Sequence, residues 1–106
     1  MYRAVVLTDP ELATGFRLAG IEVVEASSAD EARKSLRTLL DGDYGLIILN
    51  DEFMAGIDRE TARLMNERAV PVVVPFPGQR LRKEKEAENY VADLVRSCIG
   101  YSIKLR

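Results

Sequence analysis

Two carboxylates in this chain follow apolar runs that have the length of β-strands. Asp9 comes directly after residues 3–8, and Asp51 comes after residues 44–49 with Asn50 between. Because the carboxyl ends of parallel strands meet at one edge of a sheet, both side chains are expected at that edge. Carboxylate oxygens are the ligands that Mg²⁺ prefers. The first chemistry that these residue types suggest is a divalent-cation site.

A phospho-acceptor receiver domain would use such a site, but the chain resembles receivers only in part. Asn50 rather than aspartate ends the third predicted strand, Pro75 stands in place of a hydroxyl residue, and no fifth strand is expected to present a lysine. Asp9 is also explained as a helix N-cap, and Asp51 with Glu52 as acids that begin the next helix. A degenerate receiver-like signalling domain is the alternative function.

The stretch GFRLAGIE, residues 15–22, holds two glycines with the spacing of a phosphate-binding loop. Such a loop needs its glycines after a strand and before a helix, followed by a Lys-Ser/Thr pair. Here Gly15 and Gly20 lie within and at the end of a predicted helix, and Ile21 and Glu22 follow. We expect Gly15 to permit close packing of the helix and Gly20 to end it in a left-handed conformation.

The remaining residue types offer little chemistry. The chain has no histidine, which excludes histidine-ligated metals and histidine-based triads. Its single cysteine, Cys98, forms neither an internal disulfide nor a structural zinc site, and its apolar neighbours favour a buried hydrophobic role. We therefore predict no catalytic residue, no metal ligand and no cofactor, so the chain is not expected to be an enzyme.

Length and charge limit the class of protein further. A chain of 106 residues suits one domain, and 15 basic against 17 acidic residues give no field that would hold nucleic acid. Its apolar runs are too short to span a membrane, and its amino terminus lacks the pattern of a signal peptide. We expect a cytoplasmic protein that meets a membrane only indirectly, through its partners.

The elements that would position these residues alternate between strand and helix. The pattern predicts a small, doubly wound, four-stranded parallel sheet of the Rossmann or flavodoxin-like α/β class, in the order 2-1-3-4. Residues 1–78 are expected to form this sheet domain and residues 79–106 a long C-terminal helix, within one structural domain. The predicted strands are residues 3–8, 21–25, 44–49 and 70–75, and the three helices between them begin near Asp9, Ser28 and Asp58.

The C-terminal segment carries an apolar seam at spacings of four and three. It exceeds the length needed to cover a small sheet, which suggests a helical partner. Two alternatives stay open: the seam packs on its own sheet, or the alternation in IGYSIKL forms an edge strand. The seam consists of Ala87, Val91, Leu94, Cys98, Tyr101 and Leu105, widened by Tyr90, Val95 and Ile99.

Several segments together are similar to the F subunit of the rotary A-type/V-type ATPases. The resemblance is carried by LTDPELATGFRLAGIEVVEASSADEA, LIILNDEF, PVVVPFPG and VRSCIGYSIKLR, which span nearly the whole chain. It implies a non-catalytic rotor protein on the central stalk, packed against the coiled coil of the D subunit. ATP is then bound by the A and B subunits, while this chain couples or modulates rotation with proton or sodium transport. The implied partner-binding residues are Val91, Leu94, Val95, Cys98, Tyr101 and Leu105, with Arg96 and Lys104 as flanking charges.

Overall fold

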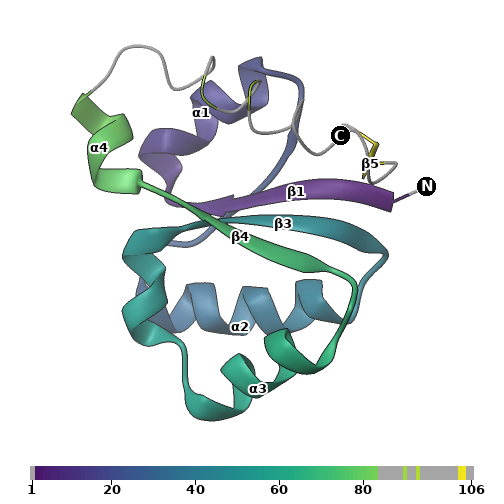
Figure 1. Ribbon diagram of the computed structural model, residues 1–106. Helices are drawn as coiled ribbons and strands as arrows, with labels where there is room; N and C mark the ends of the chain where they lie inside the picture. Colours follow the sequence, from purple (N-terminus) through teal and green to yellow (C-terminus); the bar gives the residue numbers. More distant parts are fainter. Residues whose placement is uncertain (1, 84–89, 91–92, 94–102, 105–106) are drawn as a thin grey trace.

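Four parallel strands form the centre of the fold, with helices on both faces (Figure 1). The computed structural model of the chain describes residues 2–83, 90, 93 and 103–104. The main strands lie in the order β2-β1-β3-β4, which confirms the predicted sheet. They are β1 (Tyr2–Thr8), β2 (Glu22–Glu25), β3 (Tyr44–Asn50) and β4 (Val72–Phe76).

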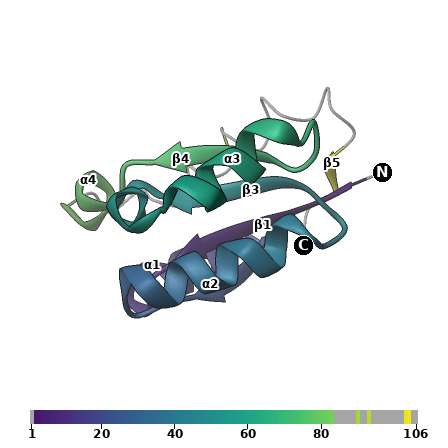
Figure 2. The ribbon, with the colours of Figure 1, turned by 90° about the horizontal axis from the view of Figure 1, so that it is seen from below.

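Three helices begin at the caps that the sequence indicates. They are α1 (Pro10–Leu18), α2 (Ala29–Leu40) and α3 (Arg59–Glu67). The side chains of Asp9, Ser28 and Asp58 accept hydrogen bonds from backbone N–H groups of the first turns, which would otherwise lack partners. In Figure 1, α1 lies on one face of the sheet, and α2 and α3 lie on the other. Figure 2 shows α2 and α3 side by side.

The two glycines of the phosphate-loop spacing have different roles. Gly20 has φ of +83° and follows α1, which confirms the left-handed helix exit. The prediction for Gly15 is wrong, because a Cβ atom added there would meet no atom within 4 Å. Gly15 therefore makes no close approach to a neighbouring element.

The hydrophobic core has two halves, one on each face of the sheet. Side chains of a strand alternate between faces, so Ala4 and Val6 point to the α1 face while Val5 and Leu7 point to the α2 face. Phe16 of α1 and Phe76 of β4 meet edge to face, with ring centroids 5.0 Å apart. Both faces of the strands are thus covered, as their continuous apolar runs indicate.

Two short helical segments flank the carboxyl ends of β3 and β4. The 3-10 helix η1 (Asp51–Gly56) follows β3 directly, with acidic residues in its first turn as predicted. The helix α4 (Gly78–Lys83) follows β4. It begins one residue before position 79, the expected start of the C-terminal helix.

The end of the chain returns to the sheet. β5 (Ile103–Lys104) pairs in parallel with Tyr2 and Arg3 of β1, so a helical seam that continues through residues 103 and 104 is wrong, and the edge-strand alternative is correct for them. The physical reason is the length of β1. Its pairing with β2 starts only at Val5, while Arg3 already pairs with β3 on the other side, so the β2 side of residues 2 and 3 is left for a further strand.

Tyr90 also touches the sheet domain, because its partly buried side chain packs against the α1-face core. This contact agrees with the alternative in which the apolar seam packs on its own sheet. The division of the chain into residues 1–78 and 79–106 stays a prediction.

Candidate functional site

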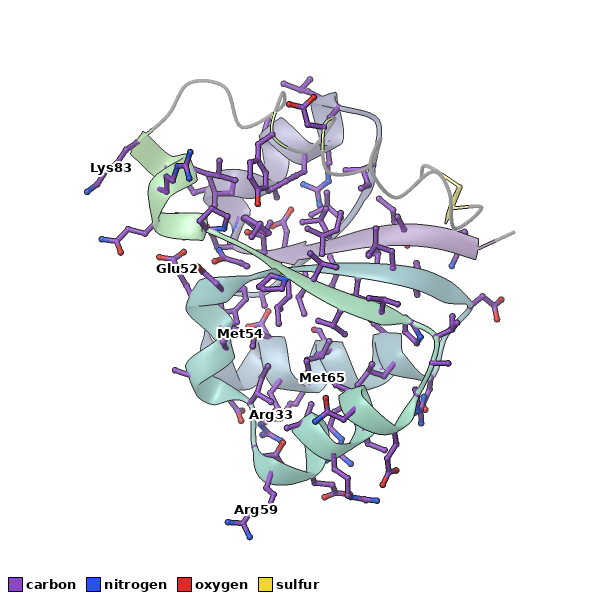
Figure 3. All side chains as sticks on the ribbon, in the orientation of Figure 1. Arg33, Glu52, Met54, Arg59, Met65 and Lys83 are labelled. Carbon is purple, nitrogen blue, oxygen red and sulfur yellow. The ribbon has the colours of Figure 1, made fainter. Side chains whose placement is uncertain are left out.

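A cluster of polar side chains lies at the carboxyl edge of the sheet. We call it the carboxyl-edge cluster. In Figure 3, Glu52 lies at η1, below α4. Asp9 and Asp51, the two acids that suggested a cation site, both belong to the cluster. An arginine that the sequence did not indicate belongs to it as well. The cluster consists of Thr8 and Asp9 after β1, Asn50 at the end of β3, Asp51 and Glu52 of η1, and Arg82 of α4.

Asn50 is the buried centre of the cluster. Its Nδ2 group donates to Thr8 Oγ1 and Asp9 Oδ1, each at 3.2 Å, and to Glu52 Oε1 at 3.1 Å. Its Oδ1 atom accepts from the backbone N–H of Glu52 at 2.9 Å and so caps η1. An amide side chain serves both purposes because it has donors and an acceptor. An aspartate here would lose the donors and add a fourth carboxylate to the cluster.

Arg82 of α4 binds two acids of the cluster, Asp9 and Glu52. Its Nη1 and Nη2 atoms donate to the two carboxylate oxygens of Asp9 at 2.9 and 2.8 Å, and Nη2 also donates to Glu52 Oε1 at 2.5 Å. Nη1 lies 3.3 Å from Glu11 Oε1. The guanidinium fork suits such bidentate contacts. Arg82 thus supplies the positive charge that the acidic edge of the sheet requires.

The ion pairs change the proton affinities of these groups. Burial raises the pKa of Asp9, but the hydrogen bonds and charge of Arg82, together with hydrogen bonds from the backbone and from Thr8, outweigh it, and the net pKa lies below the usual value. The hydrogen bond from Arg82 likewise lowers the pKa of Glu52. The two carboxylates in turn raise the pKa of Arg82. All three groups are therefore charged at neutral pH, which does not suit a general acid or base at that pH.

Asp51 binds the backbone of α4. Its Oδ1 atom accepts from the N–H of Gly78 at 3.1 Å and thereby holds the start of α4. A Cβ atom at Gly78 would lie only 2.1 Å from Asn50 Oδ1, so α4 packs closely on the cluster because residue 78 has no side chain. Both candidate phospho-acceptors, Asp9 and Asp51, are thus engaged in contacts that hold α4.

The second group of predicted residues is the partner-binding set. Val91, Leu94, Val95, Cys98, Tyr101 and Leu105 lie outside the described residues, as does Arg96. Of the flanking charges, Lys104 belongs to β5. This strand brings a lysine to the sheet, contrary to the expectation that no fifth strand would. It pairs with the opposite end of β1 from Asp9, about 20 Å away at about 3.3 Å per residue, and therefore does not complete a receiver site.

Sequence reasoning missed Arg82 and Gly78. The segment RLRKEKEAEN, residues 80–89, has the composition of a solvated helix face, and nothing local distinguishes Arg82 from its basic neighbours. The sequence feature that comes closest to indicating the role of Arg82 is the excess of acidic residues at the predicted strand ends, which calls for a nearby positive charge. Among residues 2–83, 90, 93 and 103–104, no group of three or more metal-ligating side chains is arranged to hold an ion. In the same described part, no helix is long and apolar enough to cross a membrane.

The fold and this cluster define a class of protein: a small, doubly wound α/β domain whose carboxyl edge anchors the segment that follows the sheet. The family model described as ATP synthase (F/14-kDa) subunit matches residues 4–95. The chain therefore belongs to the F/14-kDa subunit family of ATP synthases.

Individual relatives agree with this assignment. The F subunit of the V-type ATP synthase of Thermus thermophilus is 42% identical over 102 residues, which cover 94% of this chain and 98% of the relative. The F subunit of the A-type ATP synthase of Methanococcus vannielii is 38% identical over 101 residues, covering 93% and 96%. The crystal structure of the F subunit of the V-type ATP synthase from Archaeoglobus fulgidus superposes with a TM-score of 0.66 at 28% identity. The superposed region covers 72% of this chain and 98% of the Archaeoglobus chain.

Proposed function

We propose that the chain is a non-catalytic rotor subunit in the central stalk of an A/V-type ATP synthase or ATPase. It binds the D subunit and couples or modulates ATP-driven or ATP-producing rotation with ion transport. It works in the cytoplasm, at the periphery of the membrane, as part of the complex. The other subunits of the rotary ATPase are its partners.

The observation that carries this proposal is the 42% identity to the F subunit of a V-type ATP synthase over nearly the full length of both chains. A shared α/β fold alone would not support a function, because this fold serves many unrelated proteins. The match of the family model through residue 95 adds that the likeness continues past the sheet domain.

The carboxyl-edge cluster supports a non-catalytic role. Asp9 uses both carboxylate oxygens to bind Arg82, and Asp51 accepts from the backbone of α4. These carboxylates have structural partners, and the lowered pKa values of Asp9 and Glu52 keep them from carrying protons near neutral pH. ATP chemistry is accordingly assigned to other subunits.

The C-terminal segment is the proposed surface that meets the D subunit. Because Ile103 and Lys104 pair with β1, the length of the apolar seam no longer argues for a partner, and family membership supports this surface instead. The proposed contacts remain Val91, Leu94, Val95, Cys98, Tyr101 and Leu105. On a helix, the spacings of three and four from Val91 to Tyr101 would form one apolar stripe that packs on a helix of the D subunit. Leu105 follows β5, so its proposed contact does not belong to that helical stripe.

Coexpression with the D subunit of the same complex tests the proposal. Deletion of residues 99–106 and, separately, the substitution Leu94→Asp are expected to abolish coelution of the two chains. The deletion removes part of the apolar stripe, and Leu94→Asp places a charge within it. Circular dichroism of each variant reports whether the sheet domain is still folded.

Asn66→Asp, on the exposed surface of α3, is the control for the addition of a charge, and coelution should persist. Undiminished coelution of a folded Leu94→Asp variant together with the deletion variant would contradict the proposed surface. Failure of the parent chain to bind the D subunit would contradict the rotor assignment itself.

A further inference from the structure

The helix α4 follows the last of the four main strands, β4, and lies against the carboxyl-edge cluster. Its described part has six residues, Gly78–Lys83. Helices in proteins gain most of their stability from tertiary packing, so the position of this part depends on contacts with the rest of the protein. The orientation of α4 is therefore decided by the side chains that hold it.

One anchor of α4 is apolar. Leu81 is buried in the α1-face core together with Phe16 and Phe76. A single apolar side chain holds a helix on a surface but resists rotation about the contact only weakly, because hydrophobic attraction is not directional. The contacts of Gly78 with Asp51 and Asn50 fix the first residue of α4 and leave its far end, at Arg82 and Lys83, to other interactions.

The second anchor is Arg82, at that far end. It binds Asp9, 73 positions earlier in the chain, and Glu52, 30 positions earlier, so its guanidinium joins α4 to two separate elements. The side chains of Arg82 and Asp9 are 27% and 17% exposed, so solvent screens this pair less than a fully exposed one. The bidentate geometry fixes an angle as well as a distance, which an apolar contact does not.

We propose that Arg82 is a positioning residue: its contacts with Asp9 and Glu52 fix the direction in which α4 runs from the carboxyl edge of the sheet. The neighbouring Lys83 has the same charge and lies on the same short helix. In Figure 3, however, its side chain points away from the sheet domain. The two residues therefore form a matched pair in which only one carries the proposed role.

The consequence for binding of the D subunit rests on the proposed function. All six proposed contact residues follow Arg82 in sequence, so the direction of α4 contributes to their placement, together with the contacts that Tyr90 and β5 make with the sheet domain. A segment that must be ordered on binding loses affinity relative to one that already points in the right direction. Arg82 would thus contribute to partner affinity without touching the partner.

A distance measurement on the isolated chain tests the positioning role without any partner. Cys98 is the single cysteine and takes one spin label, and the exposed substitution Asn66→Cys on α3 takes a second. Pulsed dipolar spectroscopy then gives the distribution of distances between the labels. Arg82→Gln is expected to shift or broaden this distribution, Arg82→Lys to do so less, and Lys83→Gln to leave it as in the parent. Glu52→Gln, which removes one acceptor, gives a smaller change in the same direction.

Three results would overturn the inference: an unchanged distribution in Arg82→Gln, an equal change in Lys83→Gln, or a parent distribution already as broad as that of Arg82→Gln. Affinity of the chain for its D partner is measured separately. Arg82→Gln should weaken it about fivefold, the equivalent of about 1 kcal/mol. A changed distance distribution with unchanged affinity would leave the positioning role intact and remove its connection to the partner.

Discussion

The carboxyl-edge cluster and the outer surface of α2 and α3 both carry many charges. Arg37 of α2 reaches Glu60 of α3 on that outer surface, but the ion pairs of Arg63 and of Arg82 differ in what they connect. On the helices, Arg63 binds Glu67 one turn away, and both side chains are more than half exposed. At the carboxyl edge, Arg82 binds Asp9 and Glu52 from two other elements, with less exposure. The first kind of pair supports a helix that already exists, and the second kind determines where a helix lies.

This difference shows why a count of charges predicts little about a surface. An exposed pair within one helix contributes about 0.3–0.5 kcal/mol, because water and salt screen it and two long side chains lose freedom. An ion pair that joins two elements in a less exposed site contributes more to the free energy of unfolding. The contribution is larger still when a buried amide such as that of Asn50 completes the hydrogen bonds. The following substitutions test the contrast, beginning with the largest expected effect.

Asn50→Asp should destabilise the protein most. It removes the donors that reach Asp9 and Glu52 and places a third carboxylate between them in a buried position. We expect a loss of about 3 kcal/mol in the free energy of unfolding at pH 7, measured by urea denaturation. Asn66→Asp, the same change on the exposed surface of α3, should have almost no effect. Equal losses in the two variants would remove the distinction between the two regions.

Gly78→Ala should come next. The new Cβ would lie 2.1 Å from Asn50 Oδ1, so either α4 or the amide must move. Overpacking of this kind costs about 2 kcal/mol. Gly15→Ala is the matched control, because its Cβ meets nothing within 4 Å and helical alanine is favoured over glycine; there we expect a gain of about 0.5–1 kcal/mol. Melting temperatures that move in the same direction would contradict the geometry of the cluster.

Arg82→Gln should have the smallest of the three effects, a loss of about 1 kcal/mol at neutral pH against a few tenths for Arg63→Gln. Its pH dependence provides the sharper test. Asp9 and Glu52 have lowered pKa values in the folded protein, so their pairing with Arg82 stabilises the fold above their unfolded pKa values, near 4. This contribution is lost as the pH falls through the lowered folded values.

Urea unfolding of the parent and Arg82→Gln from pH 7 down to pH 3 measures this dependence. The two stabilities should differ by a constant amount between pH 6 and 7 and converge in acid. A difference that persists unchanged at pH 3 would show that Arg82 acts through packing of its alkyl chain instead of its charge.

Several features of the candidate site could be read from the sequence. Asp9 was expected as an N-cap at the end of the first strand, and Asp51 with Glu52 at the start of a helical turn, because these signals depend on neighbouring residues only. Arg82 could not be assigned, because its partner Asp9 is 73 positions away and its neighbours are equally basic. The close packing expected at Gly15 is not found for a related reason: the spacing of residues along the chain does not show which element lies opposite them.

The sequence by itself determined the four strands, their order, the helix caps and the glycine exit at Gly20, since periodicity and backbone chemistry are local properties. The tertiary structure alone decided that Arg82 completes the carboxyl-edge cluster and that Ile103 and Lys104 pair with the free part of β1. Both depend on which residues distant in sequence meet once the sheet has formed. A heptad spacing and a two-residue alternation coexist in the last residues of the chain, and the unpaired backbone groups at the start of β1 favoured the strand for residues 103 and 104.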